Sequence, residues 1–261
     1  IVFLEPARNL RLAKTITKDG SLPYPLAKMF TSHVAYVSPD EAGVREAYRV
    51  MQDHAAKGHA LHKGVLKAPL LNEPRRGKAD PNASTNLLVI DLDDFIPNKQ
   101  LPTPVTTAAL AELAESVRAV LPEPLCRTAC IANASASTGF KANGAVGLHL
   151  FFLLDRPVAP TQLSHWLTGL NFDIDLFSAQ LKLNRSCLSL KYIVDPVVAR
   201  NAQIIYIAPP ELSGVADPFA SNADRWTLVD GDQWTLDLQP LLDATVPAAV
   251  QQQAEKRLAE E

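Results

Sequence analysis

Three aspartates and one histidine have the residue types and the surroundings expected of a divalent metal site. Asp91 and Asp93 lie in Leu-Leu-Val-Ile-Asp-Leu-Asp-Asp, His149 lies in Gly-Leu-His-Leu-Phe-Phe-Leu-Leu, and Asp195 lies in Tyr-Ile-Val-Asp-Pro. Each stands in or beside a short apolar run that predicts a buried strand, where an ionised carboxylate is costly unless it is paired or binds a cation. The pattern therefore predicts a metal site built from three acids.

The spacing of the first two acids places both on one face of the predicted strand. Side chains alternate between faces with a period of two, so Asp91 and Asp93 point the same way and Leu92 points the other way. Such oxygen ligands suit Mg²⁺ or Mn²⁺, and Mg²⁺ usually completes its shell with water and substrate phosphates. A nucleotide substrate fits this chemistry. The alternative is that Asp91 caps the strand and Asp93 begins a solvated turn.

A turn rich in small residues precedes the strand of His149. Its sequence, Ser-Ala-Ser-Thr-Gly-Phe-Lys over residues 135–141, can bring backbone N–H groups close to an anion, and Lys141 adds positive charge. A histidine in an apolar strand is more often a core residue whose ring nitrogens find partners. The adjoining turn favours phosphate contact instead, so we predict that Ser137, Lys141 and His149 bind a nucleotide.

A basic segment leads into the Asp91 strand. Residues 57–78 contain four lysines, Arg75, Arg76 and two histidines but only one acid, Glu73. The net charge of the chain is −3, which by itself lowers the expectation of nucleic-acid binding. A local basic segment beside a metal site can nevertheless hold template phosphates or a triphosphate. A solvated loop is the competing interpretation.

Taken in order, these motifs resemble the archaeo-eukaryotic primase superfamily, the primase-polymerases, of the phage and mobile-element type. Asp91 and Asp93 match its first motif, Gly147-Leu148-His149 its second and Val194-Asp195 its third, over roughly residues 87–210. Each motif is short, and the specificity lies in the ordered set.

The resemblance implies a DNA-directed primase/polymerase, a nucleotidyltransferase that makes or extends primers on single-stranded template DNA. Its catalytic residues would be Asp91, Asp93, Asp195 and His149, with the three aspartates holding two Mg²⁺ or Mn²⁺ ions. The histidine would contact the incoming nucleoside triphosphate, and Arg75 or Arg76 would contact nucleotide or template. Members of this type are often fused to or associated with a helicase, which is the further partner implied.

The periodicity predicts an α/β (α+β) fold with a mixed sheet and helices on one face, resembling the modified RNA-recognition-motif core of that superfamily. A Ser38-x-x-Glu41 capping box with Pro39 at the first turn predicts the start of the first helix. The expected helices are residues 38–58, 106–120 and 161–183, and the expected strands are residues 87–91, 125–132, 146–154 and 204–207.

Composition and chain organisation complete the expectations. The 261 residues, 47% hydrophobic and 20% charged, are enough for a catalytic domain over residues 1–245, followed by a polar helical tail or linker over residues 246–261. No apolar run is long enough to span a bilayer, so we expect a cytoplasmic protein. Three cysteines are too few for a disulfide scaffold, and we expect all three to be core thiols.

Three other functions stay open on the sequence alone. The Asp91-x-Asp93 pair also resembles the haloacid-dehalogenase-like phosphatases, where the first Asp is a nucleophile and the second a general acid. That family has Thr or Val where this chain has Phe95, and it has no role for His149. The same pair recurs in nucleotide-sugar glycosyltransferases. A catalytically idle nucleic-acid-binding replication module is the third alternative, against which the intact acids argue.

Overall fold

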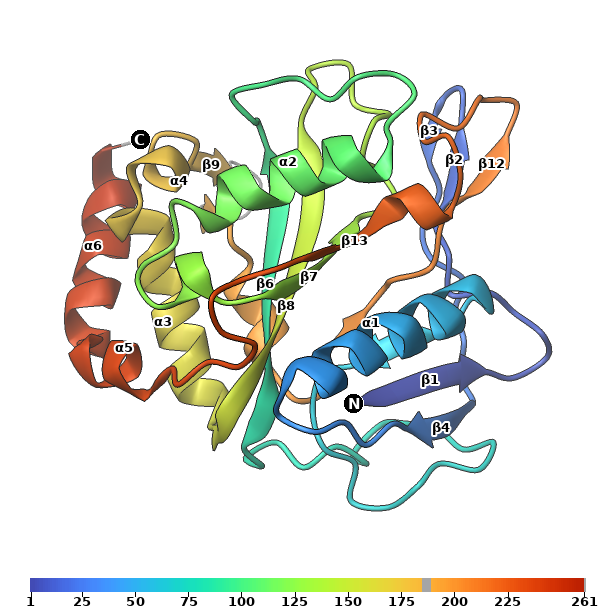
Figure 1. Ribbon diagram of the computed structural model, residues 1–261, viewed down its shortest axis with the longest axis horizontal. Coiled ribbons are helices and arrows are strands. Elements are labelled where there is room, and N and C mark those ends of the chain that lie inside the picture. Colours follow the sequence, from blue (N-terminus) through green and yellow to red (C-terminus); the bar gives the residue numbers. More distant parts are fainter. Residues whose placement is uncertain (185–188, 261) are drawn as a thin grey trace.

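The computed structural model describes residues 1–184 and 189–260 of the chain. It is a mixed α/β structure in which helices pack against several β-sheets (Figure 1), so the predicted fold class is confirmed at this level. Of the three cysteines expected in the core, Cys130 is buried and Cys126 is partly exposed. Cys187 lies outside the described residues.

A four-stranded sheet in the order β13-β7-β8-β6 forms the centre of the molecule. Its strands are β6 (Thr85–Phe95), β7 (Cys130–Ala134), β8 (Val146–Val158) and β13 (Trp226–Val229). All three pairings are antiparallel. The mixed sheet expected from the sequence is therefore not the central one; a parallel pairing occurs between two short strands elsewhere.

The apolar runs around the acids form the two longest strands. In β6 the side chains of Leu88, Ile90 and Leu92 are fully buried, and most of β8 is buried on both faces. Burial on both faces explains why these segments read as continuous apolar runs rather than alternating ones. The expected strand over residues 87–91 is thus present but extends to residue 95 and carries both Asp91 and Asp93.

The other strands of the described chain form three further sheets. A second antiparallel four-stranded sheet has the order β11-β5-β1-β4, a three-stranded sheet has the order β12-β2-β3, and β9 pairs with β10. Their bounds are β1 (Val2–Pro6), β2 (Thr15–Thr17), β3 (Gly20–Ser21), β4 (Phe30–Val34), β5 (Ala60–His62), β9 (Lys182–Asn184), β10 (Ser189–Lys191), β11 (Ile204–Ile205) and β12 (Glu211–Ser213). The sequence predicted only the position of β11.

The helices follow the predicted periodicity more closely than the strands. They are α1 (Glu41–Ala56), α2 (Thr107–Arg118), α3 (Pro160–Asp173), α4 (Asp175–Ser178), α5 (Gln239–Ala244) and α6 (Pro247–Glu260), with short 3₁₀ helices η1 (Leu125–Arg127), η2 (Pro196–Ala199) and η3 (Ala223–Arg225). In Figure 1, α2 crosses the central sheet, α1 lies beside β1, and α3, α5 and α6 form a group on one side.

Two predicted boundaries are wrong for local reasons. Helix α1 is capped by Asp40, whose carboxylate accepts from Gly43 N at 2.8 Å, and Ser38 donates to that carboxylate instead of capping the helix. The helix cap thus lies two residues later than predicted. Asp40 is the stronger cap because its negative charge is favourable at the helix N-terminus. The strand expected over residues 125–132 begins only at Cys130, since η1 occupies its first residues.

The polar tail is helical, as predicted, and contacts the body of the protein. Helix α6 lies alongside α3 (Figure 1), and Val250 is 8% exposed in this contact. Most other side chains of α6 are exposed. The tail therefore rests on the domain through a narrow apolar strip.

Candidate functional site: a carboxylate cluster with a buried histidine

Three carboxylates converge on one point of the central sheet. One carboxylate oxygen from each of Asp91, Asp93 and Asp195 lies within 4.8 Å of the other two. In the described part of the chain no other group of three His, Cys, Asp or Glu side chains comes this close. Clustered carboxylate oxygens are the donor set that Mg²⁺ and Mn²⁺ prefer, so these residues fit a hard divalent cation.

Backbone pairing brings Asp195 to the edge of β6. The extended segment before it forms an antiparallel bridge between Val194 and Leu92. Asp195 N donates to Asp91 O at 2.8 Å, and Asp93 N donates to Ile193 O at 2.8 Å. Side chains that are neighbours across an antiparallel pair share a face, so this register places Asp195 beside the two β6 carboxylates.

A fully buried asparagine of α3 fixes the segment that carries Asp195. Asn171 Oδ1 accepts from both Ile193 N and Val194 N at 2.9 Å, and Asn171 Nδ2 donates to Val194 O at 2.9 Å. Three hydrogen bonds from one buried amide leave the segment little freedom to move. Asn171 was missed in the sequence because an isolated asparagine in a helix carries no local signal of this role.

Asp195 also caps a short 3₁₀ helix. One of its oxygens, Oδ1, accepts from Val197 N at 2.9 Å at the start of η2, where Pro196 occupies the first helical position. That backbone bond holds the carboxylate in one orientation and leaves its second oxygen for another ligand. The alternative that Asp91 caps the end of its strand is wrong, because Asp91 lies inside β6.

His149 lies directly opposite Asp91 in the sheet, inside a polar row that also includes Asn133. Asn133 Nδ2 donates to Arg225 O at 3.2 Å, which turns Asn133 Oδ1 toward His149 Nδ1 at 3.1 Å. Since an amide oxygen only accepts, Nδ1 carries a proton, and Nε2 faces Asp91 Oδ1 at 3.3 Å. His149 is therefore both a satisfied core residue and a member of the site.

Local charges shift the pKa values of the cluster. Burial lowers the pKa of His149, but its attraction to Asp91, its hydrogen bond to Asp91 and the charge of Asp93 outweigh that effect and raise it overall. Partial loss of water raises the pKa of Asp93, and the negative charges of Asp91 and Asp195 add to the rise. Burial also raises the pKa of Asp195. The carboxylates repel one another in a way that a cation would relieve.

Lys141 is placed next to the cluster but is paired with a carboxylate outside it. The ammonium groups of Lys141 and Lys191 both form ion pairs with Asp94, a residue with a positive φ of 53° at the end of β6. Partial burial opposes ionisation of Asp94, but the two lysines dominate and lower its pKa to about 2. Lys141 and Lys191 together with Asp94 therefore leave one net positive charge beside Asp93.

The small-residue turn is built around a buried threonine. Thr138 Oγ1 donates to Gly147 O at 2.7 Å and accepts from Gly147 N at 3.0 Å, which ties the turn to the start of β8. A Cβ at Gly147 would lie 2.2 Å from Ser135 Oγ, so a larger residue there would require Ser135 to move. Ser137 is partly exposed, and its hydroxyl lies 3.4 Å from that of Ser135.

The two arginines line a groove that none of the three acids lines. Arg75 donates to Ala202 O at 2.8 Å, and Arg75 and Arg76 line an open groove of about 650 Å³ together with Lys28 and Lys67. Within residues 1–184 and 189–260 no ion pair joins either arginine to the three aspartates. The prediction that they sit beside the metal site is therefore not met by direct contact.

Two tyrosines from distant parts of the chain form a stacked pair. The rings of Tyr24 and Tyr206 stack with centroids 3.6 Å apart. Burial raises the pKa of Tyr24, and Tyr206 and the charges of Asp91 and Asp93 add to the rise. Burial also raises the pKa of Tyr206, against the opposing charge of Arg75. The sequence around Tyr24, Pro-Tyr-Pro, gave no signal of this position.

Comparisons with known proteins found no match. No protein-family model, no curated protein and no solved structure matches it. Within the described ranges no helix has the length and apolar character needed to cross a membrane.

Proposed function

We propose that this chain is a metal-dependent nucleotidyltransferase of the primase-polymerase type, acting on nucleoside triphosphates and a single-stranded DNA template. The observation that carries the proposal is the convergence of Asp195 with Asp91 and Asp93, which lie about a hundred residues earlier in the sequence, on a face that also holds His149. These are the four positions that the primase resemblance assigns to catalysis.

The order of the elements around the site supports the same proposal. Apart from the short elements η1, α4, β9 and β10, the chain runs through β6, α2, β7, β8 and α3 to the Val194 segment, which forms a single bridge to β6. In space the Val194 segment borders β6, β6 borders β8, and β8 borders β7, all antiparallel. This split β-α-β arrangement is the one expected of an RNA-recognition-motif-like core, with β13 added at the β7 edge.

The donor set defines the cofactor that the proposal requires. Asp91, Asp93 and Asp195 would hold Mg²⁺ or Mn²⁺, with two ions as the number that the primase resemblance implies. When bound, the ions neutralise charge on the triphosphate and on the attacking and leaving oxygens. The capping bond from Val197 orients Asp195, and the Asn171 clamp keeps it in register with β6.

The remaining site residues would bind and orient the substrate. His149, protonated on Nδ1 by its bond to Asn133, presents Nε2 to the cluster and would donate to a phosphate oxygen when charged. Ser137 would donate from its hydroxyl. Lys141 is paired with Asp94, and its ammonium would contact a triphosphate through its remaining N–H donors or by exchanging Asp94 for the substrate.

Template contact is proposed for the groove that contains Arg75 and Arg76. Four cationic side chains and no acid line it, which suits a phosphate backbone.

A fused or associated helicase is a further proposed partner, and it rests on the resemblance alone. The phosphatase alternative leaves both Asp195 and the Asn133-His149 pair without a role, so it is not favoured.

One assay tests the proposal directly. The protein is incubated with labelled nucleotides, Mg²⁺ or Mn²⁺ and a circular single-stranded DNA, with and without an annealed primer. Incorporation by the wild type that is lost in Asp91→Asn, Asp93→Asn and Asp195→Asn supports it. Hydrolysis of small phosphate esters that depends on Asp91 and Asp93 but not on Asp195 would instead identify a phosphatase.

A further inference from the structure

A second cavity lies at the opposite end of β6 from the carboxylate cluster. It has a volume of about 420 Å³ and is enclosed by the starts of β1 and β6, the end of β8, the segment after β4 and the segment after β5. Asp91 is six residues along β6 from Thr85 in this cavity, roughly 20 Å at the rise of a strand. The cavity is thus separate from the proposed active site, and its size is typical of a small-molecule pocket.

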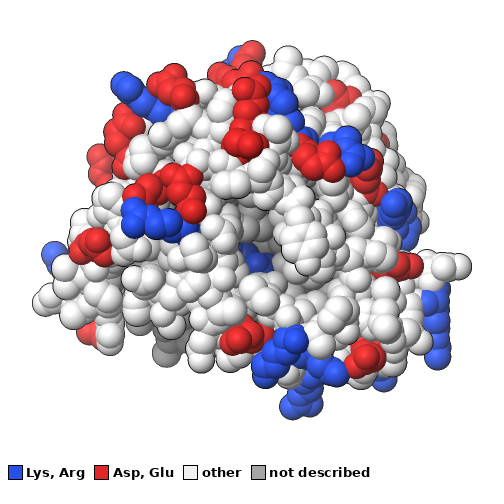
Figure 2. All heavy atoms as spheres, turned by 60° about the horizontal axis from the view of Figure 1, so that its bottom comes forward, with Lys and Arg blue, Asp and Glu red and all other residues white. Residues whose placement is uncertain are grey.

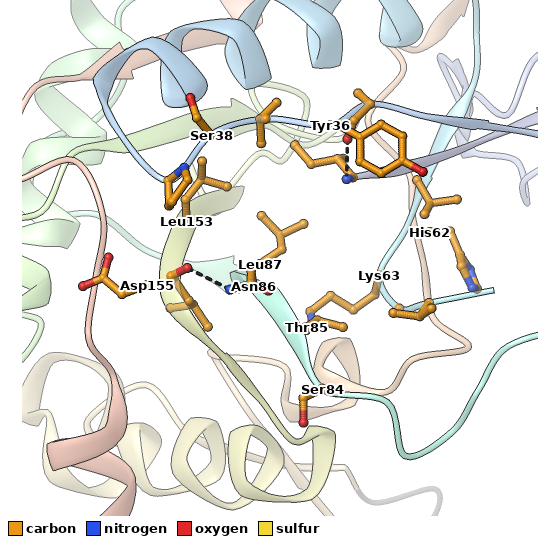
Figure 3. A pocket seen from close by; sticks show the side chains of 18 residues that line it. Tyr36, Ser38, His62, Lys63, Ser84, Thr85, Asn86, Leu87, Leu153 and Asp155 are labelled. Carbon is orange, nitrogen blue, oxygen red and sulfur yellow. Dashed lines mark hydrogen bonds between the residues drawn. The ribbon is translucent and has the colours of Figure 1, made fainter. Parts of the chain in front are cut away.

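The base of the cavity is formed by a buried lysine. Lys63 is only 3% exposed, and its ammonium donates to Thr85 Oγ1 at 2.8 Å. Figure 3 shows the two side chains pointing toward each other at one end, with Leu87 and Leu153 along the wall. An ammonium has three N–H donors, and the Thr85 hydroxyl that accepts from it still has its own hydrogen to donate. The base is therefore rich in donors.

The other charged groups of the wall do not neutralise Lys63. In the described chain no carboxylate forms an ion pair with it, and Asp155 lies across the cavity in Figure 3. The Ile1 amino group donates to Ala35 O at 2.8 Å. His62 turns its ring away from the cavity, and burial and the charges of Arg75 and Lys63 lower its pKa to about 4, so it is neutral near pH 7.

Burial without a counter-ion has a measurable consequence for Lys63. Loss of water is the cause that lowers its pKa to about 8. A negative group in the cavity would replace the missing water and counter-charge. Figure 2 shows the corresponding hollow near the centre of that face, with uncharged atoms around its opening and a blue side chain at its base.

We propose that this cavity is a binding site for a small organic anion, with the anionic group on Lys63 and Thr85 and an apolar body against Leu87, Leu153 and Leu154. The donors at the base select a carboxylate or sulfonate, because such a group accepts several hydrogen bonds at once. The apolar wall selects an aliphatic or aromatic body over a fully hydrated ion. The proposal does not depend on the function of the carboxylate cluster.

Two fluorescent probes of nearly the same shape test the proposal on the full chain. 8-Anilino-1-naphthalenesulfonate carries an anionic group, and N-phenyl-1-naphthylamine is the same ring system without it. At pH 7 and without divalent metal, the wild type should bind the sulfonate about tenfold or more tightly than the amine, the size of a charge-assisted hydrogen bond. In Lys63→Met this preference should disappear while the affinity for the neutral amine stays unchanged.

Matched controls identify the site. Lys67→Met removes an exposed lysine four residues away that lines the basic groove, and it should keep the full preference. In the wild type the preference for the sulfonate should fall between pH 7 and pH 10 as Lys63 loses its proton. This measurement does not depend on whether a variant folds. Equal affinities for the two probes in the wild type would overturn the proposal. So would a preference retained in Lys63→Met or lost in Lys67→Met.

Discussion

Replacing the clustered aspartates should stabilise the metal-free protein and abolish its response to metal. One oxygen of each carboxylate lies within 4.8 Å of the others. At that separation two full charges repel by about 1 kcal/mol in water and about 3 kcal/mol at the effective dielectric constant of a protein surface. Asp93→Asn removes two such repulsions without changing the shape of the side chain, so we expect the free energy of unfolding to rise by about 1–3 kcal/mol.

The three positions should differ because their other contacts differ. Asp91 also attracts His149, so Asp91→Asn loses a favourable contact together with the repulsion and should gain least. Asp195 caps η2, and asparagine keeps an oxygen for Val197 N, whereas alanine would lose about 1 kcal/mol of capping. The expected order of stability without metal is therefore Asp93→Asn, then Asp195→Asn, then Asp91→Asn.

Thermal unfolding with and without Mn²⁺ measures both effects. At a hundred times its dissociation constant, a ligand of the native state adds about 2.7 kcal/mol, which corresponds to a rise in Tm of roughly 5–10 °C in a protein of this size. The wild type should show this rise, and none of the three asparagine variants should. Asp19→Asn, at an exposed turn, should behave as the wild type. A Tm rise that survives in all variants, or a destabilised Asp93→Asn, would refute the reasoning.

Four further predictions follow from other parts of the structure. His149→Ala should lower the free energy of unfolding by about 1–3 kcal/mol, since it leaves Asp91 and a buried amide unpaired; a nucleotide titration of the folded variant then measures its substrate role, which an unchanged Kd would exclude. Neutralising Arg75 and Arg76 together should weaken binding of single-stranded DNA and flatten its salt dependence, and an unchanged slope would return the groove to a solvated surface. His62 is neutral when folded, with a pKa of about 4 against about 6.5 unfolded, so stability present above pH 6.5 should be lost as pH falls toward 4; chemical denaturation across this range should show a shallower loss in His62→Leu. Deleting residues 250–261 should cost only about 1–2 kcal/mol from the burial of Val250 and leave nucleotide incorporation intact, and loss of folding on that deletion would contradict it.

Local sequence patterns predicted the helices whose apolar face and capping residues lie within one segment. The helix predicted over residues 106–120 forms as α2, with Thr106 as its cap and Leu110, Leu113 and Val117 buried on one face. The helical face of α1 was also predicted correctly although its cap was not. A repeat of 3.6 residues relates only near neighbours along the chain, so it can be recognised without knowledge of the surrounding fold.

The N-terminal strands could not be found by the same means. Strands β1, β4 and β5 are three to five residues long and owe their structure to one another, because a short extended segment is stable only when it is paired. Their pairing partners are distant in sequence: Val2 pairs with His62, and His62 in turn pairs with Ile204. The cavity around Lys63 depends on these strands, and it was invisible in the sequence for the same reason.

The sequence by itself determined the types of residue in the candidate site and one geometric relation, that Asp91 and Asp93 share a face of their strand. Only the tertiary structure decided that Asp195 joins them, because that contact depends on the register of the Val194 segment against β6 and on the buried clamp of Asn171. The tertiary structure also pairs Asp94 with two lysines and places Arg75 in a groove that the three aspartates do not line. Alternation along a strand is fixed by covalent geometry, whereas contacts between distant segments are set by packing and pairing of the whole chain.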